Sequence, residues 1–538
     1  MTDWAAHAVS RLTLEEKVGQ LIWTGVGEQR GRVEGMIAAG KVGAVILGPA
    51  DLPGPEASAR YINHLQELAP IPLLVASDGE HGMGQFVIGA TDLPTNMALG
   101  AAASEELAYA AGCINAAESA AMGIHFPAPV VCDVNTNPDN PIINTRSFGD
   151  DPELVTRLAV AVARGIQEYA DGPTRVAASA WHFPGHGDTF QDSHRELPVV
   201  RHGRERLEAV ELKPFRAMVE AGVRIIGTAH VCYPALEPTP GLPATLSYAI
   251  MTDLLRQQMG FEGVVVSDSM SMWAIARNFP GELSVPMSVQ AGNELVLADD
   301  PEATHAILLA AVKDGRVTPK RLDEAVGRVL ALKQWLGLHH TALVDPTQTA
   351  QKVGTAENQA VALTIAREAV TVVKGTECIR QLRRDARVLL LTTPGARTTG
   401  IKANEALAGL FGRLCPHGQV LALEASPAPA QVEQALVLAS EADLAVVATF
   451  ARPIAYEKES TRVPPEQVSL IGRLARVVPT VVISYGSPYV LAEFAAAQAL
   501  VCTYGDCDAC LQAGIEAATG QIQAPGKLPV ALRAREGM

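Results

Sequence analysis

The first two thirds of the chain alternate between short apolar runs and longer segments with helical periodicity. The runs are continuous rather than alternating, which is typical of strands buried on both faces of a parallel sheet. One run is QLIWTG near residue 20, and seven more span residues 42–48, 72–78, 125–133, 175–181, 224–230, 263–269 and 294–300. About eight strands that alternate with helices over roughly 340 residues predict a (β/α)8 barrel.

Most of the predicted strands end in polar residues. These are Asp78, Asp133, Trp181-His182, His230, Asp268 and Asp299. In a (β/α)8 barrel the C-terminal ends of the strands build the active site. A single acid at a strand end can equally cap the next helix. Six polar ends on one side of the barrel favour a functional site.

The pattern changes after the barrel region. Residues 339–359 are polar without a strong period, which predicts a linker. Helix and strand then alternate again to the end of the chain. We therefore expect an α/β protein with a catalytic barrel at 1–338 and a C-terminal α/β sandwich domain at 360–538, since 538 residues exceed one hydrophobic core.

Composition and charge limit the molecules and the cellular compartment that the protein is expected to meet. The net charge of −15 argues against nucleic acid, which normally requires a basic patch. No apolar run is long enough for a membrane span, and the first residues lack a signal-peptide pattern. The eight cysteines are scattered, so we expect a cytoplasmic protein. Cys507 and Cys510 form a C-x-x-C motif, which we interpret as helix packing rather than a redox or metal site.

One loop concentrates candidate chemistry. The segment WHFPGHGDTFQDSHRELP follows a predicted strand, and its glycines and prolines exclude a regular helix. A metal site could use His182, His186, Asp188 and His194. Alternatively, Asp192 orients His194, which then transfers protons. A loop whose histidines only cap its own backbone is a third interpretation, and composition alone does not separate the three.

Asp268 ends the stiff β-branched strand GVVVSDS. A carboxylate on such a rigid support suits a nucleophile, because a loose one would lose its attack geometry. Retaining glycosidases need a fixed carboxylate and a proton donor on the other side of the scissile bond. Asp268 and the pair Asp192–His194 could supply these two groups.

At these residues the chain resembles glycoside hydrolase family 3, and within it the bacterial β-N-acetylglucosaminidase branch. That branch carries Lys-His-Phe-Pro-Gly-His-Gly, four residues, and then Asp-Ser-or-Thr-His. Here the motif reads WHFPGHG, four residues, and DSH. Segments 139–152, 228–236 and 260–272 are also similar, as are the closing YGSPY and APGKLPVAL. The likeness covers nearly the whole chain.

The resemblance implies a retaining enzyme that acts on a β-linked amino sugar in a small carbohydrate or glycoconjugate, without a cofactor or metal. Asp268 would attack the anomeric carbon, and His194, oriented by Asp192, would be the acid/base. The expected substrate-binding residues are Asp78, Arg146, Trp181, His182 and His230. The oligomeric state is left open.

Three departures from the branch affect the expected sugar contacts. Trp181 replaces the motif lysine, Met83 and Phe86 stand where arginines often lie, and Ser269 replaces a common second aspartate. We therefore expect activity on a sugar or aglycone other than plain N-acetylglucosamine, with Trp181 offering a stacking face in place of a charge.

Other functions stay open at this point. A phosphorylase or transglycosylase would use the same residues with a different acceptor. A sugar-binding protein with degenerate catalytic machinery would account for the missing cations. A metallohydrolase is the least favoured, because the long motif matches a metal-independent family.

Overall fold

The computed structural model describes residues 4–127, 129–169, 174–380, 386–395, 401–454 and 457–532. Its contacts divide the chain into two compact units. The first comprises Met1–Thr91, Ala108–Val134 and Thr156–Asn358, and the second comprises Asp92–Leu107, Asn135–Val155 and Gln359–Met538. The second unit thus includes two short segments from within the predicted barrel sequence. The exact domain limits stay a prediction.

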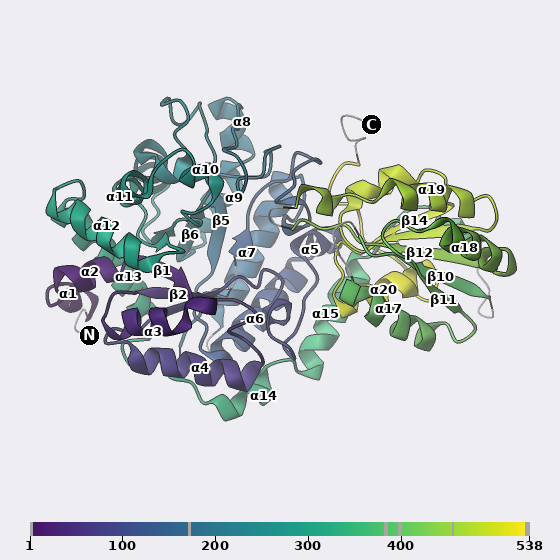
Figure 1. The fold of residues 1–538 in the computed structure, drawn as a ribbon, viewed down its shortest axis with the longest axis horizontal. Helices are drawn as coiled ribbons and strands as arrows, with labels where there is room; N and C mark the ends of the chain where they lie inside the picture. Colours follow the sequence, from purple (N-terminus) through teal and green to yellow (C-terminus); the bar gives the residue numbers. More distant parts are fainter. Residues whose placement is uncertain are drawn as a thin grey trace. The chain divides into compact units, whose positions relative to one another are not determined.

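The first unit is built on eight parallel strands (Figure 1). They are β1 (Ile22–Gly25), β2 (Ala44–Leu47), β3 (Leu74–Ser77), β4 (Pro129–Val131), β5 (Ser179–Phe183), β6 (Ile225–Thr228), β7 (Val264–Val266) and β8 (Val296–Leu297). They form two ladders, β3-β2-β1-β8 and β4-β5-β6-β7. Parallel bridges Ala76–Phe126 and Val266–Leu295 join the ladders. The sheet therefore closes into the predicted barrel.

The apolar runs explain why these strands form. Every residue of β3, β6 and β7 is buried, as expected for strands covered on both faces. Inside the barrel, large side chains such as Trp23, Phe126 and Trp181 fill the interior with Val264 and Val266. A separate apolar layer joins the strands to the surrounding helices.

Helices connect the strands of this unit. They are α1 (Trp4–Val9), α2 (Leu14–Gly19), α3 (Arg30–Ala38), α4 (Pro55–Leu68), α6 (Glu105–Met122), α7 (Pro152–Glu168), α8 (Arg204–Ala209), α9 (Leu212–Glu220), the π-helix η5 (Ala249–Gln258), α10 (Trp273–Ala276), α11 (Gly281–Ala291), α12 (Pro301–Lys313), α13 (Pro319–Leu336) and α14 (Thr349–Lys352). Local signals set their ends. Thr318 caps the start of α13 through the Arg321 N–H, and Gly337 ends it in a left-handed conformation.

The second unit contains a six-stranded sheet in the order β11-β10-β12-β13-β14-β9. Its strands are β9 (Thr371–Lys374), β10 (Val388–Thr392), β11 (Gln419–Ala422), β12 (Leu444–Thr449), β13 (Thr480–Ser484) and β14 (Ala499–Cys502). Only β9 runs antiparallel. The helices are α5 (Asn96–Ala102), α15 (Ala356–Ala369), α16 (Thr376–Arg380), α17 (Ile401–Leu414), α18 (Pro429–Glu441), α19 (Pro465–Leu474) and α20 (Asp508–Ala518).

Two sequence details have clear places here. Cys507 stands at the N-cap of α20 and Cys510 in its first turn, and both side chains are buried in the apolar layer between helix and sheet. Within the residues described, no helix has the length and apolar character needed to cross a membrane.

Candidate active site

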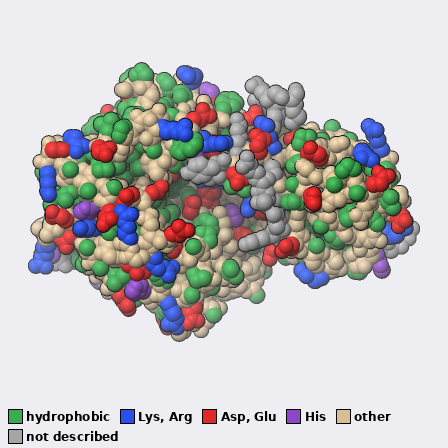
Figure 2. Space-filling model, viewed as in Figure 1, with side chains coloured by type: hydrophobic (Ala, Val, Ile, Leu, Met, Phe, Trp, Pro, Cys, Tyr) green, Lys and Arg blue, Asp and Glu red, His purple; other side chains and the backbone are tan. Residues whose placement is uncertain are grey.

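The predicted site residues of the barrel unit lie at one end of its strands. Asp78 follows β3, His230 lies two residues after β6, and Asp268 lies two residues after β7, while His182 belongs to the last part of β5. Because all eight strands are parallel, their C-terminal ends meet at the same rim of the barrel. Figure 2 shows a face of the molecule with a hollow bordered by acidic and histidine side chains.

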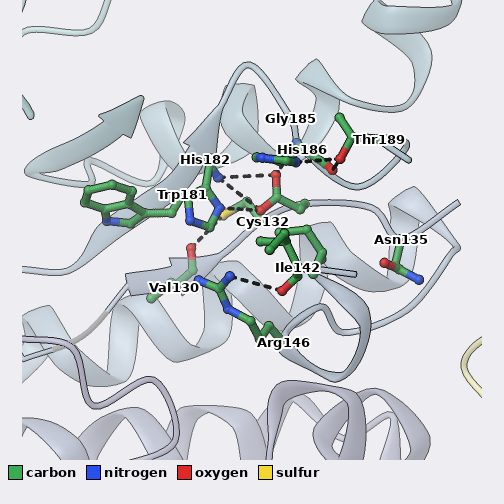
Figure 3. A network of polar contacts seen from close by, with 12 residues as sticks. Val130, Cys132, Asn135, Ile142, Arg146, Trp181, His182, Gly185, His186 and Thr189 are labelled. Carbon is green, nitrogen blue, oxygen red and sulfur yellow. Dashed lines mark hydrogen bonds and ion pairs between the residues drawn. The ribbon is translucent and has the colours of Figure 1, made fainter. Parts of the chain in front are cut away.

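Asp133, two residues after the end of β4, holds the histidine loop through hydrogen bonds. Its buried carboxylate accepts the backbone N–H of His186 at 2.5 Å and contacts Nδ1 of His182 at 2.7 Å. Burial favours the neutral acid, but the contacts with His182 and His186 outweigh it and hold the pKa of Asp133 below its usual range. Asp133 therefore fixes the ring orientation of His182 (Figure 3).

His186 ties the loop together from within. Its Nδ1 lies 2.7 Å from Oγ1 of Thr189 and its Nε2 lies 3.1 Å from Oγ of Ser193. In Figure 3 the His186 ring points toward Thr189. Both ring nitrogens thus serve the loop that carries Ser193 and its neighbours, so His186 positions these residues.

Asp192 and His194 form a hydrogen-bonded pair on this loop. Asp192 Oδ1 accepts both the His194 backbone N–H at 2.8 Å and Nδ1 at 2.7 Å. Burial raises the pKa of Asp192, but the hydrogen bonds from His194 outweigh it and lower the pKa overall. An ionised Asp192 keeps the proton of the neutral imidazole on Nδ1, which leaves Nε2 as the basic nitrogen.

Asp268 is partly exposed at the end of the β7 segment. Its Oδ1 accepts the Ser269 backbone N–H at 2.7 Å. Burial works to raise its pKa, but the nearby His230, His182 and His194 lower it below its usual range. Asp268 is therefore a carboxylate at neutral pH, and it lies close enough to His194 to interact with it electrostatically.

His230 has a role that the sequence did not reveal. Its Nδ1 lies 2.8 Å from Oγ1 of Thr245, and its Nε2 lies 2.9 Å from the carbonyl oxygen of Ser269. Burial lowers the pKa of His230, so the ring is neutral and its Nε2–H donates to Ser269. Both nitrogens are engaged within the protein, so the predicted sugar contact by His230 is not supported. The ring instead holds the backbone beside Asp268.

Trp181 also differs from its predicted role. Only 5% of the residue is exposed, and its Nε1–H donates to Ser179 at 2.9 Å. A Cβ added to Gly227 of β6 would come within 2.0–2.1 Å of three indole atoms. The indole fills the barrel interior, and in Figure 3 it extends away from His186 and Thr189. A stacking face for sugar at this position is therefore not supported, and Gly227 is the residue whose lack of a side chain makes room for the ring.

The other departures and site residues are placed as follows. Met83 is fully buried, so it contributes packing in the place of an arginine. Asp78 is exposed at the end of β3. Asp299 accepts a hydrogen bond from Ser271. Arg146, whose Nη1 donates to the Ile142 carbonyl at 3.1 Å, belongs to the second unit, and its part in sugar binding stays a prediction.

The loop histidines contact oxygen atoms of the protein. Within the described ranges, no three His, Cys, Asp or Glu side chains are grouped as a metal ion would require. Nδ1 of His182, His186 and His194 instead lies within hydrogen-bond distance of protein oxygens. The geometry therefore favours proton transfer by an oriented imidazole beside an ionised carboxylate.

A (β/α)8 barrel with polar side chains gathered at the C-terminal ends of its strands has the architecture of an enzyme barrel. The model of the Glycosyl hydrolase family 3 N terminal domain matches residues 13–332, more than half of the chain. The chain therefore belongs to glycosyl hydrolase family 3, and it is a glycoside hydrolase.

Similar proteins extend this assignment over both units. A β-N-acetylglucosaminidase/β-glucosidase from Cellulomonas fimi is 29% identical over 558 residues, which cover 98% of this chain and 95% of that protein. A β-hexosaminidase from Alkalilimnicola ehrlichii is 35% identical over 309 residues, covering 56% of this chain and 85% of that protein. The structure of a family 3 β-N-acetylglucosaminidase from Paenibacillus sp. str. FPU-7 superposes with a TM-score of 0.88 at 34% identity, covering 97% of this chain and all of that one.

Proposed function

We propose that this glycoside hydrolase is a retaining β-N-acetylhexosaminidase-like enzyme that works through a covalent glycosyl-Asp268 intermediate. The observation that carries the proposal is the combination of an ionised Asp268 with an Asp192-oriented His194 in electrostatic contact with it. The names of the relatives supply the substrate class, a β-linked N-acetylhexosamine.

In the first step an oxygen of Asp268 attacks the anomeric carbon and forms the glycosyl ester. The bond to the aglycone oxygen breaks, and that oxygen takes the proton from Nε2 of the imidazolium of His194. Ionised Asp192 stabilises the positive imidazolium before the transfer. The Ser269 N–H and His230 hold the Asp268 segment in place, so the carboxylate does not need to reorganise during attack.

In the second step water attacks the anomeric carbon while neutral His194 accepts its proton at Nε2. The ester bond to Asp268 breaks and the carboxylate leaves as the anion. Two inversions give a product of retained β configuration. A neutral base also permits an anionic acceptor, which a carboxylate base would repel. Whether phosphate can replace water is therefore part of the test.

The first experiment follows the anomeric signal of the product by NMR during hydrolysis of 4-nitrophenyl N-acetyl-β-glucosaminide. We expect the β-anomer to appear first, and an initial α-anomer would overturn the mechanism. The reaction is repeated with phosphate at about 50 mM. A sugar-1-phosphate product would identify a phosphorylase acting through the same intermediate.

A matched pair of variants tests the role of His194. A further His–Asp contact involves the same loop, with His202 Nε2 lying 2.7 Å from Asp188 Oδ2. We expect His194→Gln to lower kcat/KM about 10²–10⁴-fold for poor leaving groups. His202→Gln should stay within about threefold of wild type, since its ring has no part in the proposed reaction. Equal losses in the two variants would exclude His194 as the acid/base.

The cytoplasmic setting expected from the sequence stays a prediction.

A further inference from the structure

An exposed aromatic side chain stands close to the proposed acid/base. Trp273 is the first residue of α10 and follows Asp268 by five positions. Although it is a tryptophan, 43% of its surface is exposed. The guanidinium carbon of Arg277 lies 3.6 Å from the centroid of its ring, so the two side chains form a stacked pair.

The backbone places this pair beside the acid/base loop. The N–H of Ala274, the residue after Trp273, donates to the carbonyl oxygen of Ser193 at 3.3 Å. Ser193 stands between Asp192 and His194 in the sequence. The start of α10 is thus in direct backbone contact with the residue that precedes the proposed proton donor.

The segment that carries Trp273 is also anchored. The Met270 N–H donates to the Leu297 carbonyl at 3.1 Å, and the Ser271 hydroxyl donates to Asp299 at the end of the next strand. These contacts join the segment to β8 on one side, while Ala274 joins it to the loop on the other. Trp273 therefore stands on an anchored segment that begins just after Asp268 and contacts the loop of His194 at Ser193.

In the proposed reaction, the surface formed by Trp273 and Arg277 would contact the aglycone. The aglycone departs on the side of the proton donor, so its ring leaves the site past the neighbourhood of His194. An exposed indole offers an apolar face for a pyranose or aryl ring. Among the residues described, the Arg277 guanidinium has no carboxylate partner, so a carboxylate on the ligand would meet an uncompensated charge.

We propose that Trp273 and Arg277 form an aglycone subsite that selects leaving groups in which a ring carries a carboxylate. This inference rests on the proposed function, since it needs His194 as the acid. Within it, Trp273 supplies ring contact and Arg277 supplies the preference for a negative charge.

The chain contains a second tryptophan with arginines over its ring, and this one lies away from the proposed site. Arg175 and Arg224 lie 5.2 Å and 4.6 Å from the ring of Trp335 on α13. Arg224 directly precedes β6, so this stack is at the N-terminal end of the strands, opposite the proposed site. An arginine over a tryptophan is therefore not by itself a subsite, and Arg224→Gln is a matched control.

The experiment compares three β-N-acetylglucosaminides that differ only in the leaving group. They are the 4-nitrophenyl glycoside, its carboxylated analogue with a 3-carboxy-4-nitrophenyl group, and the glycosyl fluoride, which has no ring to contact. We expect Arg277→Gln to lower kcat/KM about tenfold for the carboxylated substrate and less than twofold for the other two. Trp273→Ala should lower kcat/KM about tenfold for both aryl substrates, mainly through KM, and leave the fluoride within twofold. Arg224→Gln should change none of them.

The outcomes are distinguishable. If Arg277→Gln changes the charged and neutral aryl substrates by the same factor, the proposed charge selection is wrong. If Trp273→Ala lowers turnover of the fluoride as much as that of the aryl substrates, the residue supports the loop instead of the aglycone, and the subsite is rejected. If wild-type enzyme turns over none of the three substrates, the proposed function itself fails.

Discussion

The two ends of the barrel are both rich in charge, yet they differ in how the charges are used. At the C-terminal ends of the strands, Asp268 is partly exposed and, among the residues that the structure describes, accepts one hydrogen bond, from the Ser269 backbone N–H. At the N-terminal ends, Glu294 is fully buried and contacts Arg256, Arg321 and Arg328 as well as the Val265 N–H. A cluster of ionisable residues therefore does not by itself identify a site. What distinguishes the proposed catalytic end is a carboxylate, Asp268, that its neighbours keep ionised while it stays partly exposed.

Lys333 and His194 show the same contrast between a buried ionisable group and a partly exposed one. Lys333 is fully buried near the N-terminal ends of the strands, where its Nζ donates to Gln20 at 2.7 Å. Burial lowers its pKa to about 7. His194 at the other end is partly exposed and paired with a carboxylate. The buried amine of Lys333 lowers the stability of the fold, whereas the imidazole of His194 is placed for the proposed proton transfer.

The largest expected effect is on chemistry at the C-terminal end. Asp268→Asn removes the proposed nucleophile, and we expect kcat/KM to fall by at least about 10⁴-fold. Thermal unfolding should shift little, because within the described part of the chain the side chain accepts one hydrogen bond, from the backbone. If Asp268→Asn keeps more than a few per cent of wild-type activity, Asp268 is not the nucleophile, and the proposed difference between the two ends of the barrel is wrong.

At the opposite end the effect should be on stability instead. Glu294→Gln leaves three arginines around a neutral side chain, and we expect a loss of about 3–5 kcal/mol in the free energy of unfolding. Activity per folded molecule should be unchanged. Urea unfolding followed by assays below the transition measures both quantities, and a large fall in kcat without a loss of stability would contradict the division between the two ends.

An intermediate effect is expected from the residue that orients the imidazole. Asp192→Asn removes the carboxylate that keeps the proton of His194 on Nδ1, and kcat should fall about 10²–10³-fold for poor leaving groups. A 2,4-dinitrophenyl glycoside, whose leaving group needs little protonation, should lose much less in the first step. Equal losses for both substrates would mean that Asp192 supports the loop fold only.

The smallest effect should be a pH-dependent gain in stability. The folded pKa of Lys333 is about 7, below its usual 10.5, so burying the amine disfavours its charged form. The resulting penalty is full below pH 7, declines as the pH rises toward 10.5, and is absent above it. Replacing Lys333 with Met should therefore stabilise the protein by about 2–3 kcal/mol more at pH 6 than at pH 9. A gain that does not vary with pH would show that Lys333 is already neutral or solvated.

Much of this architecture could be predicted from the sequence, because strand burial and strand ends are local signals. The continuous apolar runs predicted the eight barrel strands, and the motif around His194 predicted the pairing with Asp192. The roles of Trp181 and His230 could not be predicted in this way. Each depends on a partner far along the chain, Gly227 for the indole and Ser269 for the imidazole, and nothing in the local pattern indicates those contacts.

The surroundings of the ionisable residues at the N-terminal strand ends could not be predicted from the sequence either. Glu294 and Lys333 lie in segments that read as ordinary strand and helix, and their partners come from segments elsewhere in the sequence. An isolated acid or amine in such a segment gives no indication of whether it will be exposed, paired or neutral. Only the assembled barrel determines this.

The most direct test of the central claim is to trap the intermediate. Wild-type enzyme is treated with a 5-fluoro-N-acetylglucosaminyl fluoride, which forms a glycosyl-enzyme but slows its hydrolysis, and the peptides are analysed by mass spectrometry. We predict one glycosyl group per chain, attached to Asp268, with no adduct in Asp268→Asn. An adduct on another residue, or complete turnover of the reagent with inverted product and no labelled enzyme, would contradict the assignment of Asp268 as the nucleophile.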